Sequence, residues 1–317
     1  MSPGSRDRAS TGEQHRLARR RANLRLRALL IQAVREFFTE RGYLEVDTPL
    51  LIPAPAPEAH IEAIRVGGCY LQTSPELCMK RLLSSGFSRI FQISRCFRAG
   101  ERGDLHLPEF SMLEWYRTGK DYGFLMDECE SLILFLALRL GRGVTLRYQD
   151  REIALGRPWE RISVDAAFDR YSSVSLEEAL AGKTFDQVMV DQIEPSLGLN
   201  RPTLLYDYPA PMAALARLKP DNRTVAERFE LYMAGVELGN GFSELNDPAE
   251  QRIRFEGELE TIKASGKEPY PMPERFLSAL KHMPRAAGMA LGVDRLTMLF
   301  CNAPKIDDVV PFTPEEL

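Results

Sequence analysis

Apolar residues recur at helical spacing in several stretches of the chain. The first stretch ends near Glu40, and its apolar members lie three or four positions apart: Leu26, Leu29, Leu30, Ala33, Val34, Phe37 and Phe38. This spacing brings them onto one face, so we expect an amphipathic helix that stops at Gly42. Further helices are predicted over residues 75–85, 121–140, 247–266, 274–282 and 296–300.

Other stretches have the alternating, β-branched or aromatic pattern of strands. They cover residues 89–98, 109–117, 227–242 and 286–295, whereas residues 142–222 carry little signal of either kind. Strands and helices come in groups rather than in regular alternation. The fold class expected from this arrangement is α+β, with an antiparallel sheet flanked by helices.

The composition is that of a globular protein with one large domain or two ordinary ones, since 44% of the 317 residues are hydrophobic. No run of eighteen apolar residues is present, which argues against a membrane span, and the first residues lack the pattern of a secretory signal. The five cysteines are scattered and form no Cys-x-x-Cys pair. We therefore expect reduced thiols in a cytoplasmic protein, without a disulfide framework or a zinc cluster.

Charge is distributed unevenly along the chain. Residues 1–27 contain eight arginines and two acidic side chains, for a net charge of +6, while the remainder carries −10. An acidic body is a poor electrostatic partner for a polyanion, so tRNA is not the expected partner. We expect residues 1–15 to form a disordered basic N-terminus and residues 16–317 to form the folded domain. The basic run is either a nucleic-acid arm or, as we favour, a solvated helix start.

Three separated segments carry motifs, although the chain has neither a P-loop nor the Gly-x-Gly-x-x-Gly turn of a Rossmann fold. The first is the predicted long helix followed by Gly-Tyr-Leu-Glu-Val-Asp-Thr-Pro at 42–49. The second begins with Phe97-Arg98 and continues through His106 and Pro-Glu-Phe at 108–110 to Met-Leu-Glu-Trp-Tyr at 112–116. The third is Gly-Met-Ala-Leu-Gly-Val-Asp-Arg-Leu at 288–296. In this order they resemble the signature of class II aminoacyl-tRNA synthetases.

The resemblance implies a class II synthetase-like catalytic domain over residues 16–317 that activates a carboxylate with ATP and Mg²⁺. Activation builds negative charge on the α-phosphate, and arginine suits that charge because its planar fork binds phosphate oxygens and stays protonated. By resemblance, Arg98 and Arg295 are the catalytic residues. The implied ATP contacts are Arg98, Glu101, His106, Leu107, Phe110, Glu237, Leu238, Gly292 and Arg295.

Two positions depart from the usual second motif. The glutamate that normally completes Phe-Arg-x-Glu is displaced by one position to Glu101, which weakens the case that it contacts ATP. Leu107 stands where an asparagine is usual before Pro108. That change matters little if the residue offers only its backbone to the adenine.

Carboxylates are expected to hold the metal, because Mg²⁺ prefers oxygen ligands. By resemblance these are Glu237 and Glu244. On a straight strand the two would point to opposite faces, because successive side chains alternate. Gly239 and Gly241 permit a bulge that would bring them to one face.

The residues that set substrate choice resemble those of the lysine-specific subgroup. A buried glutamate suits an ammonium group, because a buried cation without a partner is very costly. Relatives that bind aspartate or asparagine would need a cation in its place. The implied substrate-binding residues are Ser74, Glu76, Tyr116, Asn240, Glu244 and Ala290.

Within that subgroup the chain resembles the elongation factor P–(R)-β-lysine ligase family. Its first predicted helix begins near residue 16, which leaves no room in this sequence for the anticodon-binding OB-fold of a full lysyl-tRNA synthetase. Ala290 replaces the glycine usual in those synthetases, and its methyl group would crowd an α-amino group by about 1–3 kcal/mol. The resemblance implies activation of (R)-β-lysine or lysine and transfer to a lysine of elongation factor P, by a homodimer formed through the first motif.

Two other interpretations stay open at this point. One is a truncated lysyl-tRNA synthetase that charges tRNA, and the other is a non-catalytic synthetase paralogue that regulates a partner. Intact Arg98, Glu237, Glu244 and Arg295 argue against the non-catalytic paralogue. The sequence leaves α-lysine and (R)-β-lysine both open as substrates.

Overall fold

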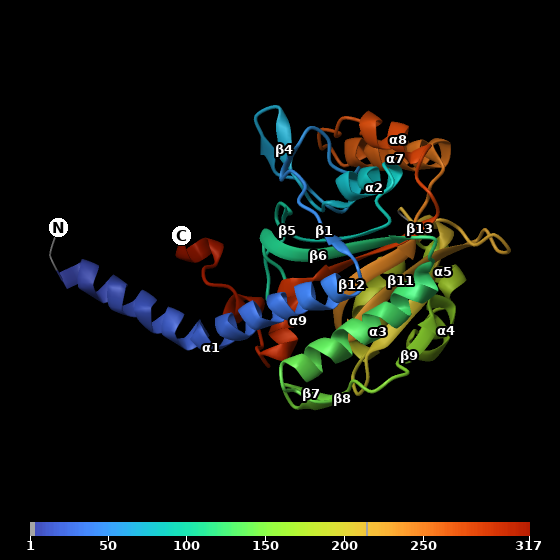
Figure 1. The fold of residues 1–317 in the computed structure, drawn as a ribbon. Helices are drawn as coiled ribbons and strands as arrows, with labels where there is room; N and C mark the ends of the chain where they lie inside the picture. Colours follow the sequence, from blue (N-terminus) through green and yellow to red (C-terminus); the bar gives the residue numbers. More distant parts are fainter. Residues whose placement is uncertain (1–3, 214) are drawn as a thin grey trace.

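An eight-stranded sheet forms the centre of the protein (Figure 1). The computed structural model describes residues 4–213 and 215–317, with side-chain burial from residue 13 onward. In spatial order the strands are β1 (Leu44–Glu45), β5 (Arg89–Phe97), β6 (Glu109–Thr118), β13 (Ala286–Gly292), β12 (Val236–Ser243), β11 (Val225–Met233), β10 (Thr203–Pro209) and β9 (Glu160–Ser163). Only the edge pairs β1–β5 and β9–β10 are parallel. The predicted α+β class with a mainly antiparallel sheet is confirmed.

The predicted strands match the sheet closely, with two differences. The range 227–242 is two strands, β11 and β12, joined at Ala234 and Gly235, which have φ angles of 56° and 74°. The range 286–295 stops being a strand at Gly292, and α9 (Val293–Phe300) begins there, three residues earlier than expected. Every residue of α9 except Arg295 is buried, so its burial is not confined to one face and apolar periodicity does not mark where it starts.

Helices cover both faces of the sheet (Figure 1). On one face lie α1 (Gly4–Glu40), α3 (Tyr122–Arg139) and α9, whose apolar side chains share one core with the sheet. On the other lie α2 (Glu76–Ser84), α7 (Pro248–Ala264) and α8 (Glu274–Leu280), which contribute to a second core. All six were expected from their apolar periodicity, with ends that differ by a few residues at most, except at the start of α1.

Successive side chains of β5 and β6 point alternately into the first core and into the second. Phe91 and Trp115 are paired in register and face α1, where both rings pack within about 5 Å of Phe38, at 5.0 and 5.2 Å between centroids. The next pair in register, Ile90 and Tyr116, belongs to the core under α2 and α8. One strand pair therefore anchors both helical layers, and its second face is available to build a site.

Residues 142–222, which carried little sequence signal, complete the far edge of the sheet. Their side chains form a third, smaller core. The elements are β7 (Thr145–Tyr148), β8 (Arg151–Ala154), β9, α4 (Val164–Tyr171), α5 (Leu176–Ala181), α6 (Phe185–Val188), a π-helix (Met189–Ile193), two 3₁₀ helices (Glu194–Ser196 and Ala210–Met212) and β10. A separate small sheet is formed by β2 (Leu51–Ile52), β4 (Cys69–Leu71) and β3 (Arg65–Val66).

The N-terminal helix is longer than expected. We predicted disorder for residues 1–15, whereas α1 extends back to Gly4, and residues 1–3 lie outside the described part of the chain. Adding residues to an existing helix needs no new nucleation, which favours extension through this alanine- and arginine-containing stretch. The domain boundary at residue 16 stays a prediction. No helix in the described ranges combines the length and apolar character needed to cross a membrane.

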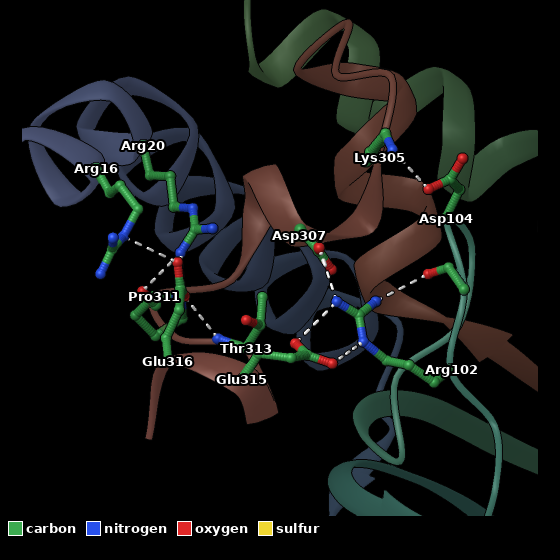
Figure 2. Close-up of polar contacts among 11 residues, drawn as sticks. Arg16, Arg20, Arg102, Asp104, Lys305, Asp307, Pro311, Thr313, Glu315 and Glu316 are labelled. Atoms are coloured by element: carbon green, nitrogen blue, oxygen red, sulfur yellow. Dashed lines mark hydrogen bonds and ion pairs between the residues drawn. The ribbon is translucent and has the colours of Figure 1, made fainter. Parts of the chain in front are cut away.

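The segment 305–316, which we call the strap, contains two 3₁₀ turns (Ile306–Val309 and Pro314–Glu316) and lies against α1 (Figure 2). Arg20 donates hydrogen bonds to the Glu316 carboxylate (2.6 Å) and to the Pro311 carbonyl (3.2 Å). Arg16 pairs with the same carboxylate at 3.3 Å. The strap is thereby attached to the projecting half of α1.

The strap also holds the loop between β5 and β6 (Figure 2). Arg102 of that loop bonds to Asp307 at 2.8 Å and to both oxygens of Glu315, at 2.8 and 3.0 Å. The Ile306 amide donates to the Asp104 carbonyl at 2.8 Å, and Lys305 pairs with the Asp104 side chain at 2.9 Å. The second motif therefore has contacts to residues about 200 positions away.

Candidate active site

A cavity of about 780 Å³ lies on the face of the sheet beside α2 and α7. It collects residues from the second and third motifs, although these are far apart in the sequence. Fourteen of the fifteen predicted site residues line it; the exception, Glu244, lies directly behind the wall. The lining members are Ser74, Glu76, Arg98, Glu101, His106, Leu107, Phe110, Tyr116, Glu237, Leu238, Asn240, Ala290, Gly292 and Arg295.

One end of the cavity is basic and is organised around Arg295. Its Nη1 donates to the Glu237 carbonyl (2.8 Å) and carboxylate (3.2 Å), and its Nε donates to the Leu105 carbonyl (3.2 Å). His106 Nε2 lies 2.6 Å from Arg295 Nη2. Burial lowers the pKa of His106, and the Arg295 charge lowers it further. A neutral imidazole that accepts a hydrogen bond from Arg295 fits both observations.

Arg98 is the second cation of this end. Its guanidinium lies 5.1 Å from the centroid of the Phe110 ring and 3.7 Å from the Glu101 carboxylate. Glu101 faces the cavity despite its displacement in the sequence, because Gly100 adopts a φ of 75° that turns the loop. The contact of Glu101 with ATP remains a prediction. Its position in the cavity wall removes the objection that it is displaced by one position in the second motif.

The other end of the cavity is acidic. Lys80 of α2 is fully buried, and its Nζ lies 2.5 Å from Glu76 Oε1 and forms a second ion pair with Glu244 Oε2. Burial lowers the pKa of Lys80, but the charges of Glu244 and Glu76 more than offset this and raise it above its ordinary value. The lysine therefore stays charged and fixes both carboxylates.

Glu114 and Tyr116 extend the acidic end along β6. Tyr116 donates to Glu114 Oε2 at 2.7 Å. Burial raises the pKa of Glu114 well above its usual range, and the charge of Glu76 adds to this effect. Gly288 has no room for a side chain here, because a Cβ would lie 2.2 Å from the Tyr116 ring and 2.5 Å from Glu244 Oε1.

Ala290 occupies the middle of the cavity floor. It is paired in register with Asn240 on one side and Glu114 on the other, and all three line the cavity. Its methyl group therefore lies between the acidic end and the basic end. That position is consistent with the predicted effect of the Ala290 methyl group on where the substrate's amino group can lie. This effect stays a prediction.

Comparison with known proteins agrees with this geometry. The family model described as tRNA synthetases class II (D, K and N) matches residues 13–316. The chain belongs to this class II family. It is 40% identical over 308 residues to the elongation factor P–(R)-β-lysine ligase of Proteus mirabilis, covering 92% of this chain and 94% of that protein. The protein of the same name from Pectobacterium carotovorum is 41% identical over 315 residues, with 93% and 95% covered. That from Vibrio cholerae is 39% identical over 308 residues, with 92% and 95% covered.

The predicted pair of metal ligands is not brought together in this class II site. A register shift in β12 does place Glu237 on the same face as Asn240, as a bulge was expected to do. Glu237 and Glu244 are nevertheless seven residues apart on an extended strand, which corresponds to about 20 Å. Glu244 pairs with Lys80 instead. The described residues contain no group of three or more metal-ligating side chains.

Glu230 is a better partner for Glu237, and our sequence reasoning missed it. It lines the cavity, lies opposite Asn240 in the ladder, and accepts hydrogen bonds of 2.6 Å from Tyr208 and Tyr232. Alternation of polar residues along β11 was the available signal. Lys80 was missed as well, although its spacing of four from Glu76 on a predicted helix is the pattern of an ion pair.

Proposed function

We propose that the protein activates (R)-β-lysine, or lysine, with ATP to give an aminoacyl-adenylate, and then transfers the aminoacyl group to a lysine of elongation factor P. The observation that carries the proposal is one cavity with arginines at one end and carboxylates at the other. Such a cavity suits a ligand with phosphate at one end and ammonium at the other. The names of the relatives, at 39–41% identity over more than 90% of the chain, give the proposal its substrate and acceptor.

The first step forms a bond between the substrate carboxylate and the α-phosphorus of ATP, and pyrophosphate leaves. Arg98 and Arg295 stabilise the charge that develops on the phosphate oxygens, since both cations face the same end of the cavity. Neutral His106 adds no charge and holds Arg295 in place. The protein needs no general base for this step, because the carboxylate is already ionised.

The second part of the proposal concerns the metal. Glu230 and Glu237 are carboxylates that face the cavity from neighbouring strands, and Mg²⁺ is commonly held by one or two carboxylates together with substrate phosphates. When bound there, Mg²⁺ would neutralise phosphate charge. Burial raises the pKa of Glu194 to about 7, and the charges of Glu230 and Glu237 contribute to this shift. Arg228 pairs with Glu230 at 2.7 Å and Arg295 pairs with Glu237 at 3.2 Å, so a bound Mg²⁺ would share these carboxylates with the two arginines.

The acidic end selects the substrate. Glu76 and Glu244 are two carboxylates that share one cation, Lys80, so an ammonium of lysine or β-lysine would supply a second cation at this end. We place this activity in the cytoplasm. We also propose a homodimer through α1 and β1, because the first motif exposes Leu29, at 53%, and Leu44, at 51%.

The test is ATP–pyrophosphate exchange with α-lysine and (R)-β-lysine, followed by transfer of labelled amino acid to elongation factor P or to lysine tRNA. We expect exchange with β-lysine and label on elongation factor P. Label on tRNA at about 1 s⁻¹ or faster would instead favour a truncated lysyl-tRNA synthetase. Absence of exchange with either amino acid would favour a non-catalytic paralogue.

A further inference from the structure

Glu58 lies in the loop between β2 and β3 and faces the same cavity. Its side chain is half-buried. The loop is fixed just after it: the Ala59 amide donates to Glu258 of α7 at 2.7 Å, and the Ala63 amide donates to the Tyr270 hydroxyl at 2.9 Å. Glu58 therefore has a defined position in the cavity wall rather than on a free loop.

Among the residues that the structure describes, the Glu58 carboxylate differs from its neighbours in having no bonding partner. Glu76 pairs with Lys80, and Glu258 accepts from the Ala59 amide. Glu114 likewise accepts from a tyrosine hydroxyl. Within the described part of the chain, the hydrogen bonds and ion pairs of the structure include none to the Glu58 carboxylate. A half-buried carboxylate without a protein partner is available to a ligand.

The charges around Glu58 locate it between the two ends of the cavity. Burial raises the pKa of Glu58 to about 7, and the negative charge of Glu76 is the next cause. Arg98 and Arg228 oppose the rise, while Glu258 adds to it. The pKa of Glu58 is thus influenced by charges at both the acidic end and the phosphate-binding end of the cavity. In an adenylate bound across the cavity, the reacting carbonyl carbon lies between those ends.

Transfer to a lysine makes a chemical demand that activation does not. A lysine side chain has an ordinary pKa near 10.4, so fewer than roughly one amine in a thousand is neutral at pH 7. Only the neutral amine has the electron pair that attacks. A base with a pKa near the working pH meets this demand best.

We propose that Glu58 is the general base that deprotonates the acceptor lysine in the transfer step, an inference that rests on the proposed function. The ammonium gives one proton to the Glu58 carboxylate, and the freed electron pair forms a C–N bond to the adenylate carbonyl carbon. The bond from that carbon to the phosphate oxygen breaks, and AMP leaves with its electron pair. The second amine proton passes to AMP or to solvent, and Glu58 returns its own proton to water.

Other groups of the cavity are less suited to this task. His106 is occupied by Arg295, and Glu244 is fully buried behind the wall. Glu58 instead adjoins His60, which is exposed, and shares the cavity with Ile253, whose side chain is 69% exposed. An incoming lysine side chain can reach this part of the cavity from solvent.

The test compares the parent with Glu58→Gln and Glu58→Asp, using Glu62→Gln as the matched control. Glu62 is an exposed glutamate of the same loop, paired with Lys267 and absent from the cavity wall. Adenylate is formed on each enzyme, excess ATP is removed, and single-turnover transfer to elongation factor P is followed between pH 6 and 9. Pyrophosphate exchange shows that a variant is folded and activates its substrate. Release of the aminoacyl group by hydroxylamine measures transfer to an amine that is already neutral and needs no base.

We expect Glu58→Gln to lower transfer at pH 7 by about 10²-fold or more, with exchange and hydroxylamine release within threefold of the parent. The transfer rate of the parent should rise with pH, with an apparent pKa near 7. This inflection should be absent in Glu58→Gln and partly restored in Glu58→Asp. The Glu62→Gln control should match the parent.

Two results would overturn the role of Glu58 while leaving the proposed function intact. One is transfer by Glu58→Gln at the parental rate with the parental pH profile. The other is an equal loss in transfer, exchange and hydroxylamine release, which would indicate that Glu58 helps to bind the substrate rather than to accept a proton. A parent enzyme that forms adenylate but passes nothing to elongation factor P would refute the proposed function and this role together.

Discussion

Replacing Lys80 with Met should destabilise the protein strongly. Methionine preserves most of the volume of the buried stem but removes the charge that faces Glu76 and Glu244. Both Lys80 and Glu244 have fully buried side chains, and removing one partner of a buried ion pair typically costs about 3–5 kcal/mol. We expect a loss of that size at neutral pH, because one partner carboxylate would be buried without a cation.

The pH dependence of this loss identifies its cause. Burial raises the pKa of Glu244, and Lys80 is the charge that opposes the rise. Without Lys80, the folded-state pKa lies still further above the ordinary value. A carboxyl group with a raised folded-state pKa destabilises the fold increasingly as pH rises above its ordinary pKa, and the penalty disappears as pH falls. The loss should therefore be larger at pH 7.5 than at pH 5.5.

Urea denaturation at these two pH values measures the effect as a change in midpoint at constant m-value. Lys267→Met is the control, since that lysine forms an exposed ion pair with Glu62, and it should change the midpoint little at either pH. The double variant Lys80→Met/Glu244→Gln should recover part of the loss. A loss below about 1 kcal/mol, or one that grows as pH falls, would refute the view that Lys80 neutralises buried carboxylates.

Three further predictions concern catalysis. Arg98→Ala and Arg295→Ala should each lower pyrophosphate exchange by about 10²-fold, whereas the exposed Arg95→Ala should not; exchange within threefold of the parent would remove either arginine from the phosphate site. Ala290→Gly should shift the ratio of kcat/KM values toward α-lysine by about five- to two-hundred-fold, and an unchanged ratio would exclude the methyl group from substrate choice. Glu230→Gln should raise the Mg²⁺ concentration needed for half-maximal exchange, and an unchanged Mg²⁺ titration would count against Glu230 as a ligand.

Much of the fold follows from short-range patterns. The strands on either side of Arg98 and the strand before Arg295 have clear alternation, and their motifs place them in one family, so the basic end of the cavity was predictable. The same patterns did not reveal residues 142–222 as a sheet edge. Strands of four residues such as β9 carry too few positions for alternation to be read, and their pairing depends on contacts with distant segments.

The acidic end shows where sequence reasoning fails. A lysine inside a helix is ordinarily a solvated residue, so nothing local distinguishes Lys80 from an exposed one, and only the tertiary contact with Glu244 reveals it. The assignment of Glu237 and Glu244 to one metal had a different fault. It considered which face of the strand each residue occupies but left out their separation along it.

The contacts of Arg102 have a consequence for how the enzyme is assembled during synthesis. This residue stands 205 positions before Asp307 and 213 before Glu315. When the loop between β5 and β6 leaves the ribosome, the side chains that later hold it do not yet exist. The loop proposed to contact ATP would thus reach its final form only after residues 305–316 have been synthesised and the strap can dock on α1. Nascent chains stalled before residue 305 should bind ATP poorly even where the central strands have already paired.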